Sequence, residues 1–194
     1  KLIRYQNLLS DVPDIEIVSL TDLKISEKIA EPHQTAKENA IHKVREYSKL
    51  TSLPTLSIDE AATTNFLPEN EQPGVYVRRV ADKQTELTDE EQIVFWKKTI
   101  SRFSEPNKQV VWDFQMAYYD PQEDIVHTSH VTMPAQVSAV FSETIVPGYP
   151  MSSFLILPGT TKPAADLTAE EKAAAEKQIF APFVQDFRSW IHED

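Results

Sequence analysis

The clearest structural signal in this chain is a pair of alternating segments in residues 110–133, which read VVWDFQMAYYDPQEDIVHTSHVTM. One side of the first segment carries bulky apolar residues, namely Trp112, Phe114, Met116 and Tyr118. Asp113 and Gln115 alternate with them, and this period of two is typical of a β-strand with one buried face. The polar stretch 120–124 then separates this strand from a second apolar segment that ends at Met133. The pattern predicts a β-hairpin.

Helices are expected on both sides of the hairpin, and three of them are marked by a Thr-x-x-Glu signature. The signature stands at Thr35, Thr88 and Thr168. It predicts a helix start. The threonine hydroxyl accepts a hydrogen bond from the backbone N–H of the glutamate three residues later, and the glutamate carboxylate accepts one from the backbone N–H of the threonine. After the second signature, apolar residues recur at spacings of three and four from Ile93 to Phe103. This spacing predicts one apolar face of a helix.

The rest of the chain predicts shorter elements around this framework. Residues 2–9 carry an apolar stripe typical of a helix, and Pro182 is expected to break the C-terminal helix. Apolar segments predict strands at residues 15–18, 54–58, 137–141 and 154–157. This order of elements predicts a mixed α/β fold with a central sheet flanked by helices. No long polar linker divides residues 1–194, so a single domain is expected.

Composition and charge exclude several functional classes. The 194 residues are 41% hydrophobic and 25% charged, as in an ordinary folded domain, and no apolar run is long enough for a membrane span. The chain has no cysteine, which excludes a cysteine nucleophile and a thiolate metal site. A formal charge of −11 disfavours nucleic acid and anionic membranes as partners. Gly74, Gly148 and Gly159 lie too far apart for a phosphate-binding glycine loop.

Carboxylates and cations are the side chains best suited to chemistry here. Asp59 and Glu60 follow a predicted strand, and ligands of open α/β sheets gather where strands end. Asp59 therefore has two interpretations, a magnesium or water ligand and the start of a turn. Lys43 is interpreted either as a phosphate contact or as a solvated lysine. Arg78 and Arg79 suit phosphate or base contacts, and they equally suit surface ion pairs.

The histidines and serines favour no catalytic site. His127 and His130 are three residues apart on a predicted strand, so they face opposite sides and cannot simply share a metal ion. His33, His42 and His192 are isolated in the sequence. No serine stands in the Gly-x-Ser-x-Gly turn of a hydrolase. A serine–histidine hydrolase is therefore disfavoured.

Residues 1–80 resemble the inosine triphosphate pyrophosphatase family, which acts on purine nucleoside triphosphates, in the order and spacing of several motifs. The matching segments are Lys1-Leu2, Glu31 followed by TAKENAIHK (35–43), LSID (56–59) and PGVYVRR (73–79). A later segment, ADLTAEEK (165–172), is also similar to a family motif. The resemblance implies an elongated α/β fold of two lobes around a cleft, with a central mixed sheet.

The same resemblance implies a function. Family members use magnesium and water to split a nucleoside triphosphate into the monophosphate and pyrophosphate, and they clear deaminated purine nucleotides. Carried over by position, Glu31 and Asp59 would hold Mg²⁺ and orient the attacking water. Lys1 and Lys43 would contact phosphates, and Arg79 would line the nucleotide cleft. The resemblance also implies a homodimer and a cytoplasmic location.

Departures from the family pattern keep an alternative function open. Ile58 replaces the first aspartate of an Asp-Asp pair, and Glu60 with Ala61 replaces the Ser-Gly that follows. Residues 148–153 and 176–178 differ from the motifs that recognise the purine in the family. The alternative is a catalytically degenerate family member that acts as a nucleotide-binding or protein-interaction module. A structural domain unrelated to nucleotides is the third hypothesis.

Overall fold

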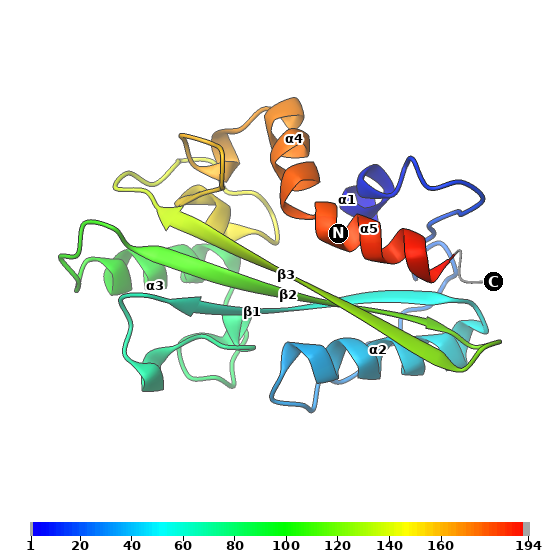
Figure 1. Ribbon diagram of the computed structural model, residues 1–194. Helices are drawn as coiled ribbons and strands as arrows, with labels where there is room; N and C mark the ends of the chain where they lie inside the picture. The colour runs from blue at the N-terminus through cyan, green and yellow to red at the C-terminus, as the bar shows by residue number, and fades with distance from the viewer. Residues whose placement is uncertain (1, 192–194) are drawn as a thin grey trace. The chain divides into compact units, whose positions relative to one another are not determined.

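Four strands form one sheet within residues 2–191, the part of the chain that the computed structural model describes (Figure 1). The strands lie in the order β1 (Thr55–Thr64), β2 (Gln109–Asp120), β3 (Ile125–Val137) and β4 (Leu155–Ile156). Together with the helices, this sheet confirms the mixed α/β class. The expected mixed sheet is wrong in one respect, because neighbouring strands run in opposite directions. A short turn joins β2 to β3, and such a hairpin connection requires antiparallel pairing.

The three capping signatures all begin helices. The α-helices described are α1 (Leu2–Leu8), α2 (Ala36–Thr51), α3 (Asp89–Ile100), α4 (Ala169–Ile179) and α5 (Ala181–Trp190). The short 3₁₀ helices are η1 (Glu69–Glu71), η2 (Val77–Arg79), η3 (Pro150–Ser153) and η4 (Ala164–Asp166). Thr35 accepts the N–H of Glu38 at the start of α2, and Thr88 forms the reciprocal pair of bonds with Glu91 at the start of α3. Local capping chemistry therefore fixes where these helices begin.

The hairpin is confirmed, and alternation along β2 sends neighbouring side chains to different helices. Ala117 packs with Ala40 and Val44 of α2. The even-numbered Tyr118 instead contacts Phe187 of α5, with ring centroids 5.4 Å apart. Because successive strand residues point to opposite faces, α2 and α5 cover the two faces of this part of the hairpin (Figure 1). Burial of both faces explains why β2 is apolar on both sides here.

Two predicted strands are wrong. Residues 15–18 form no strand, and the carbonyl of Ile17 instead accepts a hydrogen bond from the Gln6 side chain. Residues 138–141 also leave the sheet, because the Ser138 hydroxyl bonds both the N–H and the carbonyl of Val140. Such local side-chain bonds offer the backbone an alternative to strand pairing. The expected break before Pro182 is confirmed, since α4 ends at Ile179 and α5 begins at Ala181.

The described chain divides into two compact units, each assembled from separated segments. The first unit comprises residues 2–59, 114–131 and 176–191. The second unit comprises residues 60–113 and 132–175. Each of the three long strands contributes residues to both units, so neither unit is a continuous stretch of sequence. The expected single domain stays a prediction.

Each unit has its own aromatic core. In the first unit, Phe183 and Phe187 of α5 are buried, and the ring of Phe183 contacts Tyr5 of α1. In the second unit, Trp96 of α3 packs on Phe154, and both side chains are fully enclosed.

None of the helices within residues 2–191 combines the length and apolar character needed to cross a membrane.

Candidate functional site

Helix α2 brings three of the predicted site residues together in the first unit. Lys43 lies two turns into this helix, and its Nζ is 2.9 Å from Oδ1 of Asp59 and 3.1 Å from Oε1 of Glu31. The ammonium also donates to the carbonyl of Ile58, at 3.1 Å. The three donor hydrogens of Lys43 thus meet three oxygens, two of which belong to carboxylates. We refer to Glu31, Lys43 and Asp59 as the acid–lysine cluster.

The acid–lysine cluster is half-buried and carries one more negative than positive charge. The side chains of Lys43 and Asp59 are each 13% exposed, and that of Glu31 is 38% exposed. Burial raises the pKa of Asp59 above its ordinary value, and Glu31 adds to this, although Lys43 and a hydrogen bond from Asn39 act in the opposite direction. Burial opposes the charge on Lys43, but the two carboxylates outweigh it and raise the pKa of the ammonium. A second cation at the carboxylates would relieve this imbalance.

Asn39 supports the acid–lysine cluster and is a functional residue that the sequence motifs do not single out by itself. Its side chain is 2% exposed and spans the gap between α2 and the preceding loop. The amide oxygen accepts the N–H of His33 at 3.0 Å, and the amide nitrogen donates to the carbonyl of His33 at 3.2 Å. The signal in the sequence is an asparagine on the same helix face as Ala36, Ala40 and Val44, where a polar group needs partners.

Asp59 lies inside a strand, and the reasoning that placed it at a strand end is wrong. Strand β1 continues through Asp59 to Thr64. Ala62 pairs with Gly74 beyond the carboxylate, with Ala62 N–H to Gly74 carbonyl at 3.0 Å and the reverse bond at 2.9 Å. This pairing gives the backbone partners after the charged residues. The side chain of Asp59 is therefore positioned by a regular strand.

The remaining predicted site residues lie elsewhere. Arg79 belongs to η2 in the second unit, where its guanidinium lies 5.3 Å from the ring centroid of Tyr76. Arg78 forms ion pairs with Asp89 at 2.6 Å and with Glu86 at 3.5 Å, so the surface ion-pair interpretation holds for this arginine. Lys1 lies outside the described residues.

The donor set of the acid–lysine cluster suits a hard divalent cation that also binds phosphate. Among residues 2–191 no group of three or more histidine, aspartate or glutamate side chains could enclose a metal ion. Two carboxylates near one point, Glu31 and Asp59, are nevertheless what Mg²⁺ typically uses when substrate oxygens and water complete its shell. The cluster therefore fits a cation bound jointly with a substrate and does not fit a closed protein cage.

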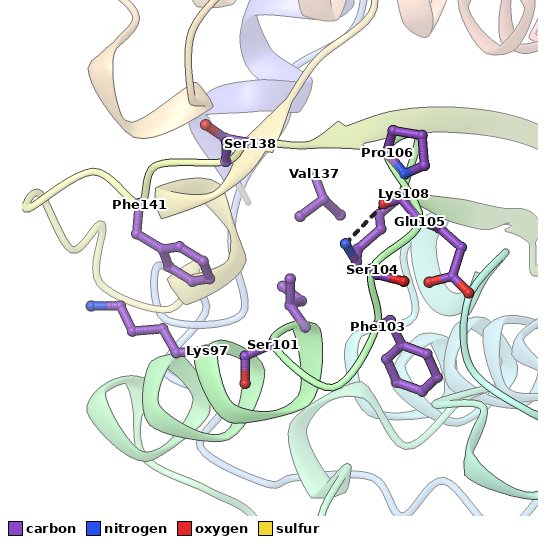
Figure 2. A pocket seen from close by; sticks show the side chains of 12 residues that line it. Lys97, Ser101, Phe103, Ser104, Glu105, Pro106, Lys108, Val137, Ser138 and Phe141 are labelled. Carbon is purple, nitrogen blue, oxygen red and sulfur yellow. Dashed lines mark hydrogen bonds between the residues drawn. The ribbon is translucent and has the colours of Figure 1, made fainter.

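A separate groove in the second unit has a different character. It encloses about 470 Å³, and its lining includes Lys97, Lys108, Val137 and Phe141. Figure 2 shows the Nζ of Lys108 directed at the carbonyl of Glu105, 2.9 Å away. Lys97 lies over the ring of Phe141, 5.3 Å from its centroid. The groove thus combines apolar walls with two ammonium groups, without the paired acids of the acid–lysine cluster.

Several known proteins that are similar in sequence to this chain are named dITP/XTP pyrophosphatase. A model of the Ham1 family matches residues 1–181. The dITP/XTP pyrophosphatase of Escherichia coli strain K12 is 28% identical over 169 residues, which cover 87% of this chain and 82% of that protein. The dITP/XTP pyrophosphatase of Leptospira interrogans is 26% identical over 158 residues, which cover 81% of this chain and 76% of that protein.

Solved structures show the same fold. A HAM1 protein from Coxiella burnetii has a TM-score of 0.75 and 25% identity, covering 100% of this chain and 93% of that chain. The Ham1 protein of Staphylococcus aureus has a TM-score of 0.71 at 16% identity, covering 98% and 92% of the two chains. The second likeness concerns the fold alone.

Proposed function

The chain belongs to the Ham1 family, and from this premise we propose that it hydrolyses a nucleoside triphosphate to the monophosphate and pyrophosphate. The resemblance found in the sequence is thereby confirmed at the level of the family. The relatives named dITP/XTP pyrophosphatase support this reaction and suggest purine triphosphates of inosine or xanthosine type as substrates. The observation that carries the proposal is the pair of carboxylates on either side of Lys43.

The acid–lysine cluster supplies the charges that this reaction needs. The reaction breaks the anhydride bond between the α- and β-phosphates, and water provides the new oxygen on the monophosphate. We assign Glu31 and Asp59 to hold a divalent cation, Mg²⁺ in our proposal, which when bound offsets phosphate charge. A carboxylate oxygen in this pair can also accept a hydrogen bond from the attacking water. The raised pKa of Lys43 keeps its ammonium charged, and a phosphate oxygen would replace one of the three oxygens that this ammonium contacts.

Two further cations are assigned to the nucleotide. Lys1 is assigned to a phosphate, as the family pattern implies. Arg79 is assigned to the nucleotide, as the family pattern implies. Its guanidinium lies over the ring of the neighbouring Tyr76. In a chain with a net charge of −11, such fixed cations are needed to attract a polyanion. The homodimer and the cytoplasmic location are part of this proposal.

The direct test is pyrophosphate release from a panel of nucleoside triphosphates. The panel contains dITP, XTP, ITP, ATP and GTP, each with Mg²⁺ and with a chelator. We expect release that depends on Mg²⁺ and is fastest for one of the deaminated purines. Turnover should fall sharply in Glu31→Gln and not in Glu27→Gln, a change at an exposed glutamate of the same segment.

Two outcomes would contradict the proposal. Nucleotide binding without pyrophosphate release would support the degenerate alternative, a binding module. Equal activity of the Glu31→Gln and Glu27→Gln variants would remove the acid–lysine cluster from the reaction. No observation on the described residues favours the degenerate alternative over the enzyme.

A further inference from the structure

The carboxylate of Asp89 connects two segments that are far apart in the sequence. Asp89 is the first residue of α3 in the second unit. Its Oδ1 accepts a hydrogen bond from Nη1 of Arg78 at 2.6 Å, and its Oδ2 accepts the backbone N–H of Gly148 at 2.7 Å. One carboxylate thus bonds the η2 turn with one oxygen and the loop around Gly148 with the other. We refer to Arg78, Asp89 and Gly148 as the Asp89 clamp.

The Asp89 clamp is not required to cap the helix. Thr88 and Glu91 already form the reciprocal capping box at the N-terminus of α3. An acidic residue in the first helical turn is favourable in general, but it needs no specific partner for that effect. Both oxygens of Asp89 instead bind groups outside the helix. The side chain therefore has a task other than starting α3.

The segment on the arginine side is held at several points. Nη2 of Arg78 donates to the carbonyl of Leu87 at 3.1 Å, and the N–H of Leu87 returns to the carbonyl of Arg78 at 2.8 Å. The buried amide of Gln92, one turn along α3, donates to the carbonyl of Val77 at 3.1 Å. Val77 and Arg78 of η2 are thus attached to Gln92 and Asp89 of α3 and to Leu87 just before it. Arg79 follows Arg78 directly in that turn.

The segment on the glycine side depends on a special backbone conformation. Gly148 has a φ of +79°, which side-chain-bearing residues rarely adopt. This conformation leaves its N–H free to point at Asp89, and the following N–H, that of Tyr149, closes a turn onto the carbonyl of Val146 at 2.9 Å. The clamp therefore sets where this loop lies relative to η2 within the second unit.

We propose that Asp89 is a positioning residue for nucleotide binding, which acts through Arg79 by tying the η2 turn to the Gly148 loop. This inference rests on the proposed function, because Arg79 is assigned there to the nucleotide. A rigid η2 turn lowers the entropic cost of presenting the Arg79 guanidinium at binding. Asp89 touches neither substrate nor reacting atoms in this proposal. Loss of the Asp89 carboxylate weakens nucleotide binding equally in the ground state and in the transition state. The expected effect is therefore a higher KM at an unchanged kcat.

The test compares Asp89→Asn and Asp89→Ala with a matched control. The control is Glu71→Gln, which removes the negative charge from another carboxylate–arginine pair of the second unit, with Arg102 at 2.8 Å. We expect the KM for the best triphosphate of the panel to rise about tenfold in Asp89→Ala with kcat within about twofold. The KM should rise less in Asp89→Asn, because the amide oxygen can still accept one of the two hydrogen bonds. Glu71→Gln should match the parent protein.

A second measurement separates this inference from the proposed reaction. Hydrogen exchange of residues 77–87 and 146–149 should speed up together in Asp89→Ala and stay unchanged in Glu71→Gln, whether or not the protein turns over nucleotide. Unchanged exchange in these segments would overturn the inference. So would an unchanged KM, or a fall in kcat at constant KM. If exchange is faster in Asp89→Ala but the parent protein hydrolyses no triphosphate, the structural role of Asp89 stands and the proposed function is overturned instead.

Discussion

The acid–lysine cluster and the Asp89 clamp use similar side chains with opposite balance. In the first, one ammonium lies between two carboxylates, whereas in the second one carboxylate lies between an arginine and a backbone N–H. The pKa of Asp59 is raised by burial, and the pKa of Asp89 is lowered by its hydrogen bond from Arg78 and then by that from Gly148. Burial disfavours the charge on Asp59 more than Lys43 favours it, whereas two hydrogen bonds favour the charge on Asp89. The comparison separates a place that can take a further cation from one that only holds structure.

The largest effect is expected when Lys43, the cation that both carboxylates of the acid–lysine cluster contact, is removed. Lys43→Ala leaves Glu31 and Asp59 without the ammonium and removes a proposed phosphate contact. We expect kcat/KM for the triphosphate to fall about a hundredfold, as when one charge-stabilising donor is removed from an active site. Pyrophosphate release under saturating Mg²⁺ measures it.

The matched control for this change is Lys49→Ala. Lys49 lies on the same helix and pairs with Glu46 at the surface. Its replacement should leave kcat/KM within about twofold, since exposed pairs of this kind contribute little. A fall of similar size in both variants would show that α2 is merely sensitive to charge loss and would contradict a specific role for Lys43.

The next effect concerns stability and Asn39, the uncharged side chain beside the acid–lysine cluster. Asn39→Ala leaves the N–H and the carbonyl of His33 without their side-chain partners and removes the hydrogen bond to Asp59. We expect the free energy of unfolding to fall by about 1–3 kcal/mol, the usual cost of buried polar groups left unpaired. Urea unfolding measures it, with Lys49→Ala as the exposed control. A loss no larger than that of the control would mean that water replaces the amide at no cost.

A smaller effect should separate activity from stability. Asp59→Asn removes a carboxylate whose burial is unfavourable, and Glu31 still pairs with Lys43. We expect the free energy of unfolding to change by less than about 1 kcal/mol, because Glu31 still compensates the charge on Lys43 and the desolvation cost of the Asp59 carboxylate is removed. Pyrophosphate release should nevertheless fall strongly. A large loss of stability in urea unfolding would identify Asp59 as a structural residue.

The sequence predicts the helices of these two regions better than their meeting points. The Thr35 and Thr88 signatures locate the starts of α2 and α3, because capping is a contact between residues three apart. The sequence predicts that the strand before Asp59 ends at residue 58. The strand continues to Thr64, where β2 lies beside it in the sheet and Gly74 pairs with Ala62. Both partners are distant in the sequence and carry no local signal.

The candidate site shows the same division. The family resemblance names Lys43, Asp59 and Glu31 together, whereas the residues alone leave Lys43 and Asp59 each with a structural alternative and do not single out Glu31. The Asp89 clamp was not predicted at all, because its bond to Gly148 joins positions 59 residues apart. Asn39 could have been found from the sequence, since a polar residue on the apolar face of α2 requires buried partners.

The smallest effect is a difference in the pH dependence of stability between the two carboxylates. Asp89 has a pKa below the ordinary 3.8 in the folded protein, so its stabilising contribution is complete above 3.8 and is lost as the pH falls through the folded pKa. Asp59 has a pKa above 3.8, so its unfavourable contribution is absent below 3.8 and grows as the pH rises through the folded pKa.

Thermal melts from pH 3 to pH 6 can resolve these opposite signs. Relative to the parent protein, Asp89→Asn should lose more stability toward pH 6 than at pH 3, because the parent gains from this carboxylate as it ionises. Asp59→Asn should instead compare more favourably with the parent toward pH 6, where the parent holds an ionised and half-buried Asp59. Parallel curves for the two variants would contradict the contrast between a cation-deficient cluster and a satisfied clamp. Curves of opposite slope would tie that contrast to proton binding, independently of any nucleotide.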